Sequence, residues 1–166
     1  MKTQNRARLA CFLLPLLLLI LGCDSYGDDD PQPTDEEMLV GKWAITGFVD
    51  DTGDRSDIIA KGYAGVHLEF VDDGSGGLEV FPKHGPAKLI GTSYHVDDEL
   101  NFISMIVDFG LDAVLSLDMA YTFSSDGQKA SFHTIHSDAL NTIFQSDLTG
   151  DVRVIASKFG EEGVPE

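Results

Sequence analysis

Apolar and polar residues alternate along most of the chain after residue 40, which predicts a succession of β-strands. A period of two belongs to strands, because successive side chains of a strand point to opposite faces. The clearest run covers residues 113–123, and its apolar positions are Leu115, Leu117, Met119, Tyr121 and Phe123. Weaker runs of the same kind cover residues 42–49, 63–71, 78–81, 88–96, 128–136 and 151–158, and residues 100–109 form a further predicted strand.

Short turns separate these runs and favour antiparallel pairing. The pair Asp126-Gly127 suits the positive φ angles of a hairpin turn. Residues 72–77 and 97–98 are further predicted turns. About eight strands at this spacing favour a closed barrel. The predicted fold class is all-β: an antiparallel up-and-down β-barrel of about eight strands, with little helix.

Four segments fit the strand pattern less well. Residues 36–40 are expected to form a short helical turn that closes one end of the barrel. Residues 56–61 are expected to form another turn, with Ser56 as its N-cap. Residues 100–109 are apolar on both faces, so their register is open, and part of them could be a lid or a helix. Residues 140–148 are expected to be a strand or a loop.

The N-terminus has the features of a secretory signal. Three basic residues precede an apolar run over residues 9–21, which is short for a membrane span. The sequence Ile20-Leu21-Gly22-Cys23 resembles the lipobox of bacterial lipoproteins. This resemblance implies cleavage before Cys23, a diacylglycerol on its sulfur and acylation of the new N-terminus. Several acyl chains, such as palmitate, would anchor the protein stably.

The chain is therefore expected to have four parts: a signal peptide (1–22), a lipidated acidic tether (23–37), a barrel domain (38–160) and a disordered tail (161–166). The tether has too few apolar residues to fold. Acids soon after the lipidated cysteine resemble both surface-export and inner-membrane retention signals. We expect a lipid-anchored protein of the cell envelope, with the outer membrane or cell surface favoured and the inner membrane as the alternative.

Removal of the signal makes an acidic chain more acidic. The full chain has 11 basic and 28 acidic residues and a formal net charge of −17. Three bases leave with the signal, so the mature chain carries −20. Such a surface repels nucleic acid, which is not an expected partner. Solubility and a salty habitat are the simplest reasons for the charge.

The acidic segments 72–75 and 97–99 lack the spacing of a calcium-binding loop and fit ordinary turns.

No motif predicts catalysis, a metal site or a cofactor. The sequence lacks a nucleophile elbow, a phosphate loop and a His-Glu-x-x-His motif. His133 and His136 would point to opposite faces of one strand. His67 and His95 could meet only if their strands pair. Of the two cysteines, Cys11 leaves with the signal and Cys23 carries lipid, so the mature domain has no thiol for catalysis, disulfides or metal. We expect a non-enzymatic protein.

The start of the first strand carries a family resemblance. The stretch Leu39-Val40-Gly41-Lys42-Trp43-Ala44-Ile45 resembles the Gly-x-Trp start of lipocalins. It is still more similar to the lipocalin-like domains of bacterial envelope lipoproteins, in which such a stretch follows the tether. The resemblance implies that Trp43 plugs the closed end of the barrel and that Gly41 lets the chain pass close beneath it. The late arginine that covers the tryptophan in lipocalins has only Arg153 as a candidate, and its parity is opposite to the apolar face of its strand.

The inner face of the barrel is expected to include Val66, Leu68, Phe70, Leu115, Leu117, Met119, Tyr121 and Phe132. In the first strand, Trp43, Ile45, Gly47 and Val49 are expected to share one face. The resemblance and this apolar lining together suggest a binding module for a small apolar ligand. The alternative is an envelope protein–protein interaction module with a filled core and no ligand. Any ligand site is expected at the end of the barrel away from Trp43.

Overall fold

The structure is a computed structural model that describes residues 33–110 and 113–159. The predicted signal peptide, Cys23, the tether as far as residue 32 and the predicted tail lie outside the described residues. Among the helices of the described ranges, none has the length and apolar character needed to cross a bilayer.

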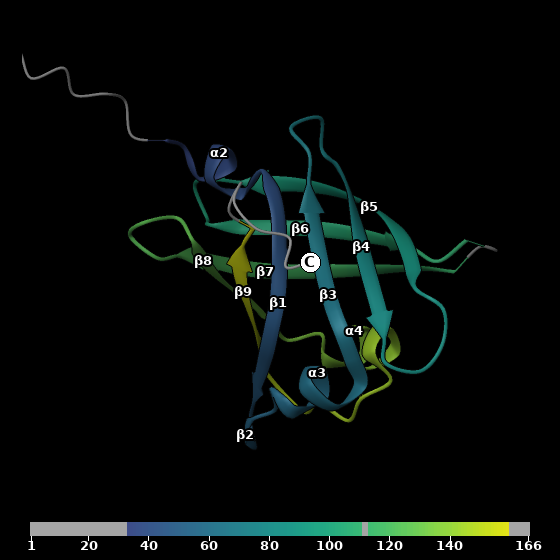
Figure 1. Cartoon of the computed structure of the whole chain (residues 1–166). Helices are drawn as coiled ribbons and strands as arrows, with labels where there is room; N and C mark the ends of the chain where they lie inside the picture. The colour runs from purple at the N-terminus through teal and green to yellow at the C-terminus, as the bar shows by residue number, and fades with distance from the viewer. Residues whose placement is uncertain (1–32, 111–112, 160–166) are drawn as a thin grey trace, which may run out of the picture. The chain divides into compact units, whose positions relative to one another are not determined.

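Eight antiparallel strands close into a barrel (Figure 1), and the two-residue strand β2 extends the pairing of β1. Each barrel strand pairs with the next one along the chain, and β9 returns to pair with β1. The predicted up-and-down barrel is therefore confirmed. The strands are β1 (Gly41–Asp50), β2 (Gly53–Asp54), β3 (Tyr63–Phe70), β4 (Ser75–Pro82), β5 (Lys88–Asp97), β6 (Phe102–Asp108), β7 (Val114–Phe123), β8 (Lys129–Thr134) and β9 (Val152–Lys158).

A β-bulge changes the inward-facing set of β1. The pairing of β1 with β9 shifts register between Ile45 and Gly47. Beyond the shift, Phe48 is fully buried in the core, whereas Val49 is only partly buried and pairs with the exposed Arg153. The prediction that Val49 shares the face of Trp43 is wrong, because the extra residue of a bulge reverses the alternation.

Two other segments differ from their predictions. Residues 75–77 belong to β4, so the predicted turn over 72–77 is shorter. A Cβ on Gly76 would lie 2.2 Å from the backbone oxygen of Glu69, which explains a glycine within a strand. A helix, α4, covers Ser137–Phe144, although residues 140–148 were predicted to be a strand or a loop. Its buried residues are Ala139, Leu140 and Phe144, and the last two lie four residues apart on one helical face.

Two further helices match the predicted turns. Helix α2 (Asp35–Leu39) begins with a capping box, in which the Thr34 and Glu37 side chains bond to each other's backbone N–H. Helix α3 (Asp57–Gly62) follows Ser56, which has the N-cap position but makes no side-chain cap bond. The Ser56 side chain instead lies against Gly47, where a Cβ would be 2.1 Å from its hydroxyl oxygen.

Trp43 closes one end of the barrel. Its indole is fully buried, and Nε1 donates a hydrogen bond to the backbone oxygen of Leu39 at 2.7 Å. The Lys158 side chain covers the Trp43 ring, and the two residues pair directly across β1 and β9. The Lys158 ammonium lies 5.3 Å from the ring centroid and donates to the Met38 oxygen at 2.7 Å. Arg153, the only candidate named from the sequence, is exposed.

Candidate binding cleft at the distal end of the barrel

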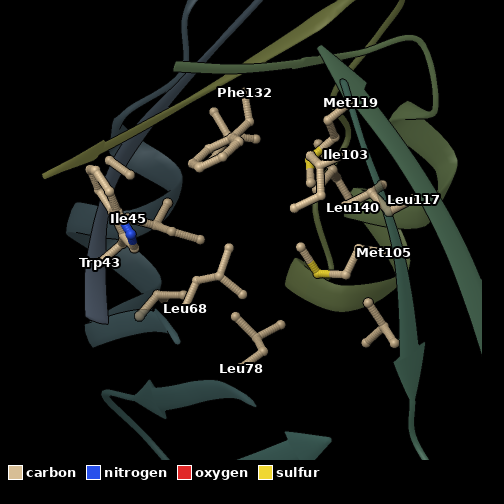
Figure 2. Close-up of a cluster of buried hydrophobic side chains, with 14 of the residues drawn as sticks. Trp43, Ile45, Leu68, Leu78, Ile103, Met105, Leu117, Met119, Phe132 and Leu140 are labelled. Carbon is tan, nitrogen blue, oxygen red and sulfur yellow. The ribbon is translucent and has the colours of Figure 1, made fainter. Parts of the chain in front are cut away.

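The barrel interior is filled by its own side chains. All eight predicted lining residues point inward, and each is buried except Leu115, which is partly buried. Side chains from opposite walls, among them Leu68, Met105 and Phe132, point toward one another inside the barrel (Figure 2). The space left among them is about 30 Å³, enclosed by apolar side chains from the barrel and α4. A ligand pocket typically needs roughly 300–1,000 Å³, whereas about 10–15 Å³ admits one water molecule.

A larger hollow lies at the opposite end from Trp43, which we call the distal end. This distal cleft has a volume of about 600 Å³. It is bounded by α3, the loop between β4 and β5, α4 and the segment after α4. Its lining residues are Arg55, Asp57, Ile58, Lys61, Gly62, Tyr63, Val80, Pro82, His84, Gly85, Pro86, Lys88, Ile143, Phe144, Gln145, Ser146 and Asp147. The sequence interpretation expected any ligand site at this end of the barrel, and that expectation stays a prediction.

Apolar contacts fix the floor of the distal cleft. Phe144 of α4 packs against Phe48 and Tyr63, with ring centroids 5.0 and 5.9 Å apart. The Tyr63 hydroxyl donates to the Phe144 backbone oxygen at 2.7 Å, and burial raises the pKa of this tyrosine. This bond satisfies a carbonyl at the C-terminus of α4 that lacks an intrahelical partner. Helix α4 therefore covers the mouth of the barrel and forms one wall of the cleft.

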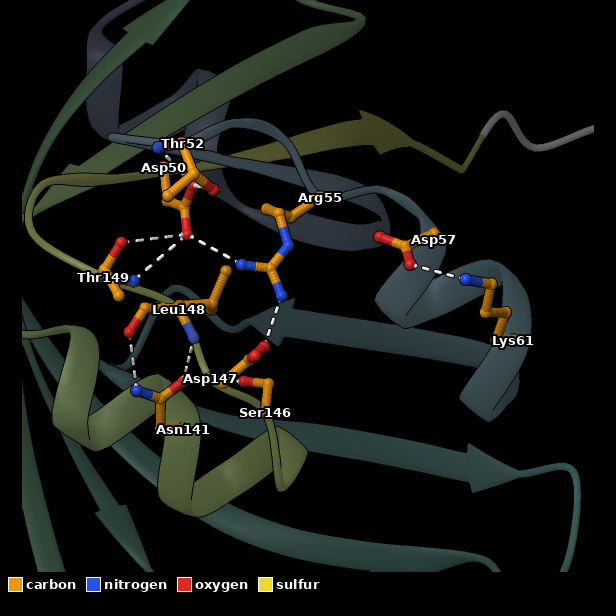
Figure 3. Close-up of polar contacts among 10 residues, drawn as sticks. All are labelled: Asp50, Thr52, Arg55, Asp57, Lys61, Asn141, Ser146, Asp147, Leu148 and Thr149. Atoms are coloured by element: carbon orange, nitrogen blue, oxygen red, sulfur yellow. Dashed lines mark hydrogen bonds and ion pairs between the residues drawn. The ribbon is translucent and has the colours of Figure 1, made fainter.

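A buried carboxylate ties the strands to the segment after α4 (Figure 3). Asp50, at the end of β1, is buried. It accepts hydrogen bonds from the backbone N–H and hydroxyl of Thr52 at 2.8 and 2.6 Å, and from the backbone N–H of Thr149 at 3.1 Å. Arg55 contacts it at 3.2 Å and also forms an ion pair with Asp147. The Thr52 hydroxyl, the backbone donors and Arg55 lower the pKa of Asp50 to about 2, although burial opposes this.

Asn141 holds the segment after α4 against the helix. Its Oδ1 accepts from the Leu148 backbone N–H at 2.7 Å and from the Ser146 hydroxyl at 2.8 Å. Its Nδ2 donates to the Leu148 oxygen at 2.8 Å. Gln145, the residue directly after the helix, adopts a left-handed conformation with a φ angle of 50°, which ends the helix. The wall of the distal cleft that contains residues 145–147 is thus fixed by side-chain hydrogen bonds as well as by packing.

Basic residues gather at the distal end. The described residues contain eight lysines and arginines, and four of them lie there: Arg55, Lys61, Lys83 and Lys88. Lys61 pairs with Asp57 at 2.9 Å, and Lys83 donates to the backbone oxygen of Ala60. Lys88 opens β5 with the same parity as the buried Ile90, so it lies on the inward side at the rim of the barrel.

The histidines named from the sequence are not brought together. His67 on β3 and His95 on β5 are separated by β4, so they do not face each other. His67 contacts Glu79 at 3.3 Å, and Lys42 forms an ion pair with the same carboxylate. Within residues 33–110 and 113–159, no group of three or more histidines, cysteines or carboxylates could hold a metal ion. The Asp73 carboxylate accepts from the Ser75 backbone N–H at 2.8 Å, as in an ordinary Asx turn.

The sequence interpretation missed the residues of the distal cleft. These residues come from elements that are distant in the chain: Arg55 precedes α3, Tyr63 begins β3, Lys88 begins β5 and Ile143 belongs to α4. The one signal in the sequence was the position of Lys88, whose place in the alternation puts a charge on the apolar face of its strand.

Comparisons of the chain with protein-family models, with curated proteins and with solved structures find no match in any of the three.

Proposed function

We propose that this protein is a non-enzymatic, lipid-anchored lipoprotein of the bacterial cell envelope, and that its barrel is a binding module whose ligand occupies the distal cleft. The observation that carries the binding proposal is the contrast between about 30 Å³ inside the barrel and about 600 Å³ in the distal cleft. Only the second volume is in the usual range of roughly 300–1,000 Å³ for ligand sites.

Three features support the lipocalin-like part of the proposal. The lipobox resemblance ends at Cys23, and the Gly-x-Trp resemblance begins at Gly41. Trp43 closes one end of the barrel, and the Lys158 cation covers its ring. In lipocalins, an arginine covers the tryptophan in this way.

An NMR titration tests the binding site. The mature chain with Cys23→Ser is titrated with a mixture of small organic fragments, and backbone and methyl shifts are followed. We expect changes at Ile58, Tyr63 and Ile143, which line the distal cleft, and none at Met105 or Met119 inside the barrel. Shifts confined to the interior methyl groups would show that the barrel opens to admit the ligand, and the proposal would fail.

A second candidate function is the protein–protein interaction module. Its support is the exposure of three apolar side chains on the strands β5 to β7: Leu89, Ile106 and Val114, with 76%, 47% and 55% of their surface exposed. The filled barrel core agrees with this function as well. If crosslinking in membranes at low salt joins a partner at Ile106, and no fragment shifts the distal cleft, the interaction module replaces the ligand-binding proposal.

A further inference from the structure

The distal cleft contains one cation that is not committed to an ion pair. Arg55 is held between Asp50 and Asp147, and Lys61 is paired with Asp57. Lys88 forms no ion pair or side-chain hydrogen bond with any residue that the structure describes. Its ammonium is therefore available to a ligand. A lysine ammonium offers three donors and a full positive charge to an acidic group.

Apolar surface lies beside this cation. Ile58 from α3, Tyr63 from β3 and Ile143 from α4 line the same cleft, and all three are partly buried against the core. Val80, which pairs with Lys88 across β4 and β5, is buried next to it. An apolar body could remove these side chains from water while an attached acidic group reaches the Lys88 ammonium.

The negative charge of the rest of the molecule makes the Lys88 cation and its apolar neighbours selective among anions. The described residues contain 20 acids and eight bases, a formal net charge of −12. The overall field repels simple anions, so an anion is retained only where a local cation and apolar contact act together. We propose, on the basis of the proposed function of the cleft, that it selects small amphipathic anions, with the acidic group at Lys88 and the apolar body over Ile58, Tyr63 and Ile143.

A pair of probes of equal shape tests this selectivity. Naphthalene-2-carboxylate and its neutral analogue 2-naphthamide are titrated into the mature chain with Cys23→Ser, and the affinity and the shifted residues are measured by NMR. We expect the carboxylate to bind at least about tenfold more tightly, equivalent to about 1.4 kcal/mol. Raising the salt concentration should weaken the carboxylate alone, because screening acts on the charge.

Two lysine variants locate the cation. Lys88→Met keeps most of the side-chain length and should remove the preference for the carboxylate while leaving the amide unchanged. Lys129→Met, at the start of β8 near the Trp43 end, should change neither affinity. Thermal unfolding midpoints confirm that both variants are folded. Equal affinities for the two probes at the cleft, or a carboxylate preference that survives Lys88→Met, would overturn the inference but leave the cleft as a binding site. Failure of both probes to shift the cleft would count against both proposals.

Discussion

At the scale of single residues, the Asp50 carboxylate holds the distal end together. It is buried at the end of β1, and its partners come from the loop after β1 and from Thr149, 99 residues further along the chain. Burying a carboxylate is unfavourable unless it is paired and fully hydrogen-bonded, as it is here. Removing its charge should therefore leave Arg55 with an incomplete set of partners.

Asp50→Asn is expected to lower the thermal unfolding midpoint by several degrees at neutral pH. The folded pKa of Asp50 is about 2, below the ordinary value of 3.8, so the stabilisation is complete above pH 3.8 and is lost as the pH falls towards 2. Urea unfolding of both proteins between pH 7 and 2 checks this, since the two stabilities should converge at low pH. Asp147→Asn is the matched control, because this carboxylate is 86% exposed and its loss should matter little. A constant difference at every pH would contradict the assignment.

At the scale of elements, α4 determines how much of the barrel interior is accessible. Leu140 and Phe144 close the mouth, and Ile143 lies at both the small interior space and the distal cleft. The helix is short, so its stability depends on this packing and on the Asn141 hydrogen bonds rather than on intrinsic propensity.

Phe144→Ala should destabilise the protein by about 3–5 kcal/mol, because it removes a buried aromatic ring and leaves a cavity at the barrel mouth. The measurement is the free energy of unfolding in urea. Thr142→Ala is the control on the same helix: its side chain is exposed, and its hydroxyl bonds only to the Asp138 oxygen. If the two variants lose equal stability, α4 does not cover the core as described.

At the scale of the whole molecule, the acidic charge and the proposed lipid anchor act together. An acidic domain is repelled by anionic headgroups, so attachment would depend on acyl chains rather than on the protein surface. Cys23 lies outside the described residues, so its lipidation stays a prediction from the lipobox resemblance.

Cys23→Ser should release the protein from membranes, because the residue that would carry the lipid is lost. Cell fractionation with detergent-phase partitioning measures the release, and mass spectrometry of the mature chain measures the acyl chains. Cys11→Ser is a matched control that should remain anchored, since Cys11 is in the predicted signal peptide. A Cys23→Ser protein that stays in the membrane fraction with its signal removed would refute the anchor.

Much of the barrel was predictable from the sequence because strand alternation is a local property. The inward set of β7 follows directly from the spacing of Leu117, Met119 and Tyr121, and burial in the structure agrees. The position of Trp43 at a closed end was implied by the resemblance of its Gly-x-Trp stretch to lipocalins. The bulge near Thr46 was not predictable, because its cause is the pairing of β1 with β9, more than 100 residues apart in the chain. Helix α4 was missed although Leu140, Ile143 and Phe144 have helical spacing, because so short a segment contains few apolar positions.

The sequence by itself determined the all-β class, the approximate number of strands and the inward faces of regularly alternating strands such as β7. Each of these depends on neighbours within a few residues. Tertiary structure alone decided that the interior is filled, that Lys158 covers Trp43 and that Lys88 faces a cleft with Ile58 and Ile143. The physical reason is that barrel closure brings together strand ends and helices that are distant in the chain, and both the space between them and the charges around it depend on that closure.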